Sequence, residues 1–427
     1  MVVGTIIGAS IFVQPSLVSG AVPSPSGMLL VWAAAGVLTL IGALVTAELA
    51  SAFPGTGGVY VFLRESYSPG VAFLWCWAMF WSMHTGIIAA IAMVCARYVG
   101  FFVPLGDTGV RVVAIAAILV LSAVNYVGVR YGTAIQTAFT IIKVAADVLI
   151  VAAGFAASRG TVPAATRSAP ALVPSLRAFV TATVAGLFAF GGWHMVTYTG
   201  DETVDARRTI PRALLIGTLA VTASYIAVNA AYIAVLSPSA VASSNRVAAD
   251  FADRVMGSGG AAAMSALVVV STLGAMTGII LTGPRVYLAA AHDALLFRWI
   301  GEIHPRYGTP HYAIALQAAW ASVLVATGTY RALFTRVVYT EWIFFGLMTA
   351  GVFVLRRRAG YAPAYRAWGY PVLPLVFIVS TAVIAFNQLA SDPIESATGL
   401  LIVLAGLPIY YLRAARLNSR TVTHADH

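Results

Sequence analysis

Twelve long apolar segments make up most of the chain and restrict the folds open to it. Proline, glycine and arginine occur in the connections between them. A helix needs about 20 apolar residues to cross the hydrocarbon core of a bilayer, and only helices or closed barrels satisfy their backbone hydrogen bonds there. The sequence therefore predicts an all-α, polytopic membrane protein. We place the spans near residues 1–19, 27–51, 70–98, 111–128, 133–156, 175–200, 211–236, 260–291, 311–329, 337–355, 371–391 and 396–413.

Glycines interrupt the first and the sixth of these segments near mid-membrane depth. The first contains Gly4 and Gly8, and the sixth contains the pair Gly191 and Gly192. Glycine costs about 1 kcal/mol relative to alanine inside a helix, so we expect both helices to unwind here. Close helix packing through small residues is the alternative explanation. Interruptions at corresponding places in two halves of a chain are typical of a transporter's central binding site.

The position of these interruptions suggests an internal repeat. If the first and sixth segments each begin a repeat of five helices, the second repeat is inverted, because an odd number of crossings reverses the direction. The repeats then cover residues 1–156 and 175–356, residues 157–174 connect them, and residues 357–427 hold two further helices and a tail. Only seven residues precede Gly8, so we expect a truncated first helix or a start that lies upstream.

The charged residues predict an orientation. Only 9% of the residues are charged and 60% are hydrophobic, whereas soluble domains carry about 25% charged residues. With the N-terminus inside, fourteen arginines face the cytoplasm and nine face outward, and Arg285 lies within a span. Positive residues favour the cytoplasmic side, so we expect a multi-pass protein of the cell (inner) membrane with both termini inside. No solvated basic face is apparent, so we expect no nucleic-acid partner.

The residues show no pattern of an enzyme. The two cysteines, Cys76 and Cys95, both fall in the third segment and suggest neither a disulfide framework nor a metal site. The sequence contains no nucleotide-binding loop with a lysine, no metal-ligand spacing and no convincing nucleophile beside a base. We therefore expect no catalytic residues, no metal and no cofactor.

Two interrupted helices offer complementary backbone groups to a ligand. The amides near Ser10 begin an outer half-helix, and such a helix N-terminus attracts a carboxylate. The half-helix that ends at Phe188 to Phe190 presents carbonyl groups suited to an ammonium. A free amino acid carries both of these charges close together, so the arrangement predicts an amino acid site.

Lys143, the one lysine of the chain, lies inside the fifth segment. An ionisable group at this depth costs at least about 2.5–3.5 kcal/mol, which makes it a functional candidate. We expect it to hold the unwound carbonyls of the first helix and to couple transport. The alternative is a structural ion pair with Asp147, one helical turn away.

Other polar residues in or near the spans have less definite roles. His194 follows the glycine pair and can face the cavity, whereas His84 is expected to pack through hydrogen bonds. Glu341 lies near the outer end of the tenth segment and its role stays open. Cytoplasmic ion pairs are the expected role of Glu48, Glu202 and Asp293.

Several motifs occur in the order found in one transporter family. Along essentially its whole length the chain resembles the amino acid permeases of the amino acid-polyamine-organocation superfamily, and among them the L-type amino acid transporter branch. The motifs are Gly4–Phe12, Ala47–Ala50, Pro54–Tyr60, Phe139–Lys143, Gly186–Trp193, Ile210–Ala213, Arg285–Tyr287, His304–Pro310 and Tyr365–Pro371.

This resemblance implies a LeuT-type fold, with two inverted five-helix repeats followed by two extra helices. It implies that Phe188 gates the site by closing over the substrate, and that Lys143 stands where some relatives hold a sodium ion, so transport is expected to be sodium-independent. The expected substrate-binding residues are Ile6, Gly8, Ala9, Ser10, Phe188, Ala189, Gly191 and His194.

The chain departs from the family pattern at several of these places. Ser10 stands where glycine is usual, Ala9 replaces a frequent serine, and His194 replaces an asparagine common in the L-type branch. His292 begins a His-Asp-Ala sequence in place of the usual Arg-Asp-Gly. The loop 101–110 contains no cysteine, so we expect no disulfide-linked heavy chain as a partner.

The sequence thus predicts a secondary transporter that moves amino acids by alternating access, through sodium-independent exchange or proton-coupled uptake. A polyamine or organic-cation carrier is one alternative, and a non-transporting membrane sensor of amino acids is another. The expected partners are the amino acid substrate and membrane lipid.

Overall fold

The computed structural model describes residues 1–8, 10–158, 174–257, 259–328 and 330–413, and only the backbone of residues 129–135 and 330–338. The regular structure in these ranges is helical. Ala9 and most of the expected connector 157–174 lie outside the described residues.

The helices fall into two groups along the chain, before and after residues 159–173. The first part of the chain forms α1 (Val2–Ile6), η1 (Ser10–Phe12), α2 (Gln14–Ala21), α3 (Pro25–Ala52), α4 (Val59–Ser66), α5 (Pro69–Ala78), η2 (Met79–Met83), α6 (His84–Val99), α7 (Asp107–Val127) and α8 (Val129–Ser158). The second part forms α10 (Leu176–Ala189), η3 (Trp193–Glu202), α11 (Ala206–Val235), α12 (Pro238–Ser243), α13 (Val247–Met256), α14 (Gly260–His292), η4 (Arg298–Gly301), α15 (His311–Thr327), α16 (Tyr330–Leu355), α17 (Val372–Ser391) and α18 (Pro393–Leu404).

Serine residues fix where several of these helices begin. Ser24, Ser68, Ser175 and Ser237 each accept a hydrogen bond from the amide three residues further on. A serine in this place satisfies one of the free amides of a helix N-terminus. Proline follows three of these serines at the first helical position, where its missing N–H costs nothing.

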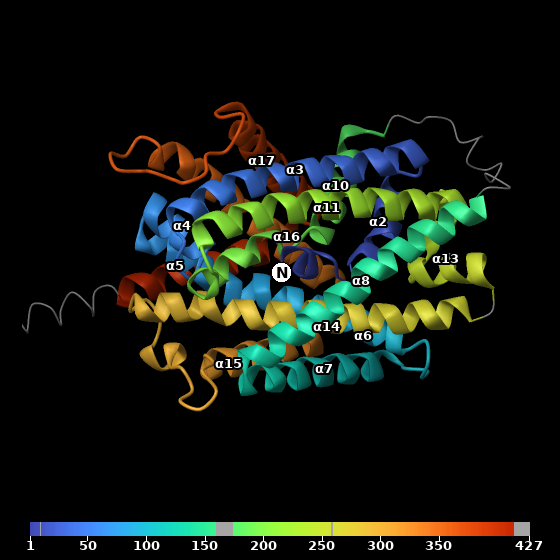
Figure 1. Ribbon diagram of the computed structural model, residues 1–427, viewed down its shortest axis with the longest axis horizontal. Helices are drawn as coiled ribbons and strands as arrows, with labels where there is room; N and C mark the ends of the chain where they lie inside the picture. Colours follow the sequence, from blue (N-terminus) through green and yellow to red (C-terminus); the bar gives the residue numbers. More distant parts are fainter. Residues whose placement is uncertain (9, 159–173, 258, 329, 414–427) are drawn as a thin grey trace, which may run out of the picture.

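The described residues confirm a multi-span protein. Nine helical stretches are long and apolar enough to cross a bilayer, and residues 311–327 and 339–355 form two shorter apolar helices. Together with the interrupted first segment, they follow the twelve predicted spans in order. Figure 1 shows most of the long helices lying side by side along the long axis, with the N-terminus near the centre of the view.

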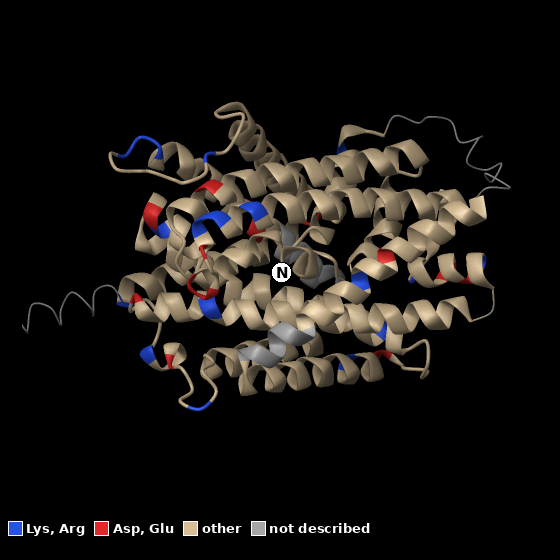
Figure 2. Ribbon diagram, viewed as in Figure 1, with Lys and Arg blue, Asp and Glu red and all other residues tan. Residues whose placement is uncertain are grey.

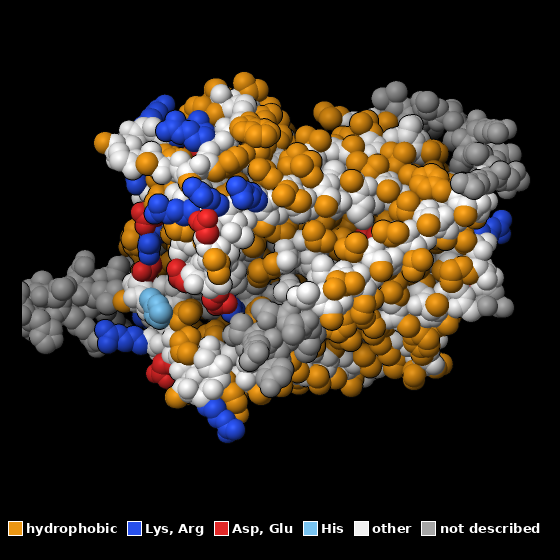
Figure 3. Space-filling view, in the orientation of Figure 1, with side chains coloured by type: hydrophobic (Ala, Val, Ile, Leu, Met, Phe, Trp, Pro, Cys, Tyr) orange, Lys and Arg blue, Asp and Glu red, His pale blue; other side chains and the backbone are white. Residues whose placement is uncertain are grey.

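Charged side chains gather at one end of this bundle. Arginines and acidic residues cluster around α4, the start of α11 and the segment before α17, on the left in Figure 2. In Figure 3 hydrophobic side chains cover the middle of the visible face, between this end and a smaller charged group on the right. A bilayer excludes charge from its core, so this pattern places the membrane around the middle of the bundle.

Ion pairs link helices at the charged end of the bundle. Arg356 contacts Glu48 through Nε and Nη2, at 2.8 and 2.5 Å, and Arg285 contacts Glu202 through Nε and Nη2, at 2.8 and 2.9 Å. The predicted pairing of these two acidic residues is confirmed.

Asp293 joins the same layer of contacts. It accepts hydrogen bonds from Tyr60 Oη at 2.6 Å and from Arg64 Nη1 at 2.5 Å. Burial and the hydrogen bond to Asp293 raise the pKa of Tyr60, which therefore stays a neutral donor. The loop that begins at His292 thus keeps its link to α4, although its sequence departs from the family pattern.

Candidate functional site

The first segment is interrupted where its glycines predict. Helix α1 ends at Ile6, and Ile7 adopts an extended conformation with φ −67° and ψ 102°. The chain bends at Gly8, forms the single turn η1 and re-enters an α-helix at Gln14. The expected break in the first span is confirmed.

The sixth segment is interrupted in the same way. Helix α10 ends at Ala189, and Gly192 takes the left-handed conformation with φ +93°. The chain then continues as the 3₁₀ helix η3. Residues other than glycine rarely adopt this backbone conformation, so the glycine pair is the local cause of the break.

The two interruptions lie against each other. Thr5 Oγ1 lies 3.2 Å from the carbonyl oxygen of Gly192, within hydrogen-bond distance, and 2.9 Å from that of Val2 in its own helix. Tyr225, which is fully buried in α11, places its hydroxyl 3.0 Å from the carbonyl oxygens of both Ile6 and Ala189. One side chain therefore links the end of α1 to the end of α10.

The Tyr225 hydroxyl gives a first testable prediction. Tyr225→Phe leaves two buried helix-end carbonyls without this donor, and a lost buried hydrogen bond costs about 1–3 kcal/mol. We expect a lower melting temperature and weaker amino acid binding, measured by thermal shift with and without ligand. Tyr232→Phe is the matched control, because Tyr232 lies on the same helix, is fully buried and has a hydroxyl with no hydrogen-bond partner among the described residues. Equal behaviour of the two variants would contradict the link.

Lys143 completes the broken end of α1. Its side chain is 1% exposed, and its Nζ donates a hydrogen bond to the carbonyl of Gly4 at 3.1 Å. In an unbroken helix this carbonyl would accept from the amide of Gly8. In the described part of the chain Lys143 forms no ion pair with Asp147, which instead accepts from Ser224 Oγ at 2.7 Å. The geometry therefore favours the carbonyl-holding role over the ion pair.

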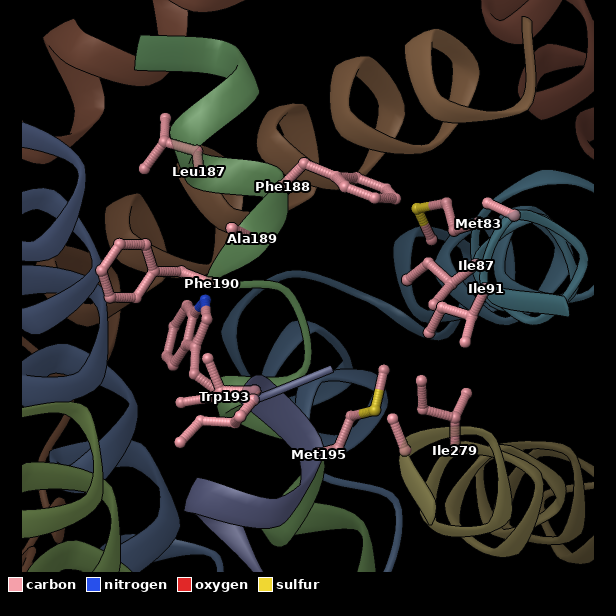
Figure 4. Packing of buried hydrophobic residues seen from close by; sticks show 14 of the residues in the cluster. Met83, Ile87, Ile91, Leu187, Phe188, Ala189, Phe190, Trp193, Met195 and Ile279 are labelled. Atoms are coloured by element: carbon pink, nitrogen blue, oxygen red, sulfur yellow. The ribbon is translucent and has the colours of Figure 1, made fainter. Parts of the chain in front are cut away.

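A narrow cavity lies between the two interruptions. Its volume is about 20 Å³, which is room for about one water molecule. Figure 4 shows the ring of Phe188 extending from α10 toward Met83 and Ile87. The cavity is lined by Thr5, Ile6, Gly8, Ser10, Ile87, Ile91, Leu187, Phe188, Gly191, Trp193, Ile279, Glu341, Trp342 and Phe345.

Most of the expected substrate-binding residues meet at this cavity. Ile6, Gly8, Ser10, Phe188 and Gly191 line it. Ala189 does not line it and instead turns its carbonyl to Tyr225. His194 is fully buried but does not line it either. Ala9 lies outside the described residues, so its expected role stays a prediction.

His194 packs behind the cavity wall among aromatic rings. Its ring centroid lies 4.8 Å from that of Phe345 and 5.4 Å from that of Tyr198. Its Nε2 lies 3.6 Å from Oε1 of Glu341. The sequence suggested His194 as a substrate-binding residue; in the structure Glu341 lines the cavity and His194 lies behind it.

Other wall residues gave no local signal in the sequence. Ile87 and Ile91 lie one turn apart on α6, and Ile279 faces them from α14 (Figure 4). In a helix that is apolar all round, periodicity does not distinguish a residue facing a cavity from one facing lipid. No group of three or more His, Cys, Asp or Glu residues suited to a metal occurs among the described residues.

These features define a class of protein: a helical membrane transporter whose central cavity lies between two interrupted helices. The family model described as "Amino acid permease" matches residues 1–409. The chain therefore belongs to the amino acid permease family. It is a transporter of amino acids and not an enzyme.

Known relatives are similar over nearly the whole chain. The serine/threonine exchanger SteT of Bacillus subtilis (strain 168) is 31% identical over 96% of this chain and 94% of its own length. The Asc-type amino acid transporter 1 of Mus musculus is 32% identical over 96% of this chain and 79% of its own. The large neutral amino acids transporter small subunit 2 of Homo sapiens is 30% identical over 96% and 78%.

Family membership and the helical architecture together establish the LeuT-type fold expected from the sequence. The resemblance to amino acid permeases near the L-type branch is likewise confirmed. The residue boundaries of the two repeats, 1–156 and 175–356, stay a prediction.

Proposed function

We propose that this chain exchanges small neutral amino acids across the cell (inner) membrane without sodium. The observation that carries the proposal is the contact between the two interrupted helices, where Thr5 meets Gly192 and Tyr225 bridges Ile6 and Ala189. It gathers free backbone donors and acceptors around one cavity. The small size of this cavity, about 20 Å³, favours small substrates and requires the walls to part when one binds.

Each end of the substrate has a backbone partner in this proposal. The amide of Gly8 forms no hydrogen bond with another described residue, and it would receive the substrate carboxylate. The carbonyl of Ile6, a residue that lines the cavity, retains acceptor capacity, since its oxygen has two lone pairs, and would receive the ammonium. The carbonyl of Ala189, which does not line the cavity, would join it once the walls part. Phe188 would gate the site from above.

Lys143 supports the absence of sodium. Its ammonium group already occupies the Gly4 carbonyl at the broken end of α1, where a bound cation would otherwise satisfy free carbonyls. We propose that this residue couples binding to the opening of the cavity, because any movement of α1 relative to α8 must stretch the Lys143 hydrogen bond.

The topology proposed for the chain has both termini in the cytoplasm, with the charged end of the bundle on that side. Lysine and arginine near span ends favour the cytoplasm. We also propose that the chain works without a disulfide-linked heavy chain. The two cysteines are both buried, and the loop 101–110 has none.

Reconstitution in proteoliposomes tests the function. Vesicles loaded with unlabelled serine should take up labelled serine or threonine from a sodium-free medium, and empty vesicles at equal pH should take up much less. The serine/threonine exchanger among the relatives makes these two amino acids the first to try. Specific binding of amino acids with no exchange would favour a membrane sensor over a transporter. Uptake of polyamines in place of amino acids would favour an organic-cation carrier.

A further inference from the structure

Glu341 is a carboxylate in the cavity wall with unsatisfied hydrogen-bonding capacity. It lies in α16, its residue is 4% exposed, and it lines the same cavity as Gly8 and Phe188. Its Oε1 has no hydrogen-bond partner among the described residues. Nε2 of His194 lies 3.6 Å from this oxygen. Both ring nitrogens of His194 also lack partners there.

A second buried carboxylate, Glu48, shows the hydrogen-bond donors that surround a structural carboxylate in this protein. Glu48 is 0% exposed and is surrounded by donors. It accepts two hydrogen bonds from Arg356, one from the amide of Ala367 at 2.8 Å and one from Tyr361 Oη at 3.3 Å. A buried carboxylate without such donors is costly. Glu341 lacks such donors among the described residues and is therefore unlike Glu48 in its structural ion pair.

None of the described arginine or lysine side chains forms an ion pair with Glu341. The charged groups of α3 and α4 lie at the cytoplasmic end and have partners of their own. The α17 helix has no acidic or basic residue, and α10 has only Arg177 near its start. The other titratable groups on the elements packed around Glu341 are His194, Tyr198, Asp201 and Glu202 of η3, His84, Cys95, Arg97 and Tyr98 of α6, Cys76 of α5, Tyr287, Arg285 and His292 of α14, Tyr339 of α16 and Glu395 of α18. The side chains of Arg331 and Arg336 of α16 lie outside the described residues.

His194 is the group among these that can share a proton with Glu341. His84 uses its Nε2 to contact the carbonyl of Ile279 at 2.8 Å. Tyr198 lies beside His194, with its hydroxyl buried and without a partner in the described ranges. Adding one proton to the Glu341–His194 pair makes it neutral overall and lets the carboxyl and Nε2 hydrogen-bond. Removing that proton leaves one uncompensated negative charge beside the cavity.

We propose that Glu341 and His194 form a proton-binding site, and that one proton travels with each amino acid during net uptake. The inference rests on the proposed transport function and adds a driving force to it. A proton from outside converts the Glu341 carboxylate to a carboxyl, and the same proton leaves to the cytoplasm when the cavity opens there. The substrate is a zwitterion with no net charge, so one positive charge crosses per cycle.

The shared cavity explains the coupling. Glu341 and the backbone groups for the substrate line one space, so both meet the same side of the membrane at the same time. A carrier with a neutral pair and a bound amino acid can cross, and an empty carrier returns after the proton has left. Exchange needs no return of the empty form and therefore no release of the proton.

Glu341→Gln separates proton-coupled net uptake from exchange, because glutamine imitates the protonated carboxyl and cannot release a proton. We expect this substitution to reduce gradient-driven accumulation of serine far more than it reduces exchange of internal for external serine. Wild-type protein in empty vesicles should concentrate labelled serine up to about tenfold per pH unit of inward gradient, with the membrane potential clamped. The variant should not concentrate it. A trapped pH dye should report acidification with wild type only.

Asp147→Asn is the matched control. Asp147 is also buried in the bundle, at 3% exposed, but does not line the cavity. This variant should keep the ratio of protons to serine. Gradient-driven accumulation by Glu341→Gln, or its absence from wild type while exchange proceeds, would overturn the proton site alone. Absence of exchange from wild type would instead overturn the proposed function.

Discussion

Replacing Lys143 with methionine is expected to reduce amino acid exchange about tenfold or more and leave the protein folded and inserted. The substitution removes the donor to the Gly4 carbonyl, so the broken end of α1 loses its hydrogen bond. A hydrogen bond from a charged group contributes about 1.5–3 kcal/mol, which corresponds to about a tenfold fall in exchange or more. Labelled serine exchange in loaded proteoliposomes measures the effect.

The melting temperature should not fall with the loss of exchange. Methionine fills nearly the same space, and removing a buried charge relieves its desolvation. We therefore expect an unchanged or higher melting temperature for Lys143→Met. Ile142→Met is the control on the same helix, since Ile142 is 39% exposed and should tolerate the change. Exchange at the wild-type rate in Lys143→Met would remove Lys143 from the mechanism.

The second large effect is expected at Gly192. Its φ of +93° costs a residue with a side chain about 1–2 kcal/mol. A Cβ here would also lie 3.0 Å from the carbonyl oxygen of Thr5, so Gly192→Ala must push the two interrupted helices apart. We expect a lower melting temperature and about a tenfold loss of serine binding or more.

Gly259→Ala separates backbone strain from the contact with Thr5. Gly259 has the same left-handed conformation, with φ +106° and ψ −18°, but a Cβ there would meet nothing within 4 Å. This variant carries the conformational cost alone and should bind serine normally. If it lost binding to the same degree as Gly192→Ala, the close approach of the two helices would not be the reason.

The sequence predicted those parts of the site that depend on local backbone chemistry. Gly8 and Gly191–Gly192 indicate unwinding through their own conformational preferences, and both breaks occur there. Lys143 was visible as the one lysine inside an apolar segment, and its contact with the first helix matches the expected role.

The parts that depend on packing could not be predicted from single residues. Tyr225 lies in a 30-residue helix, and nothing in its neighbours indicates that it reaches two other helices. The position of His194 relative to Glu341 depends on how η3 and α16 pack, which sequence spacing does not determine. That Glu341, whose role the sequence left open, lines the cavity while His194 lies behind it is therefore a result of tertiary structure.

The Tyr225 hydroxyl has only one hydrogen, yet two carbonyl oxygens lie at equal distance from it. At any instant one carbonyl holds that hydrogen and the other does not. A bound ammonium can take whichever oxygen is vacant while the tyrosine swings to its neighbour. In either arrangement one carbonyl oxygen keeps a donor from the protein, so an ammonium that binds the other need not leave both helix ends without a partner.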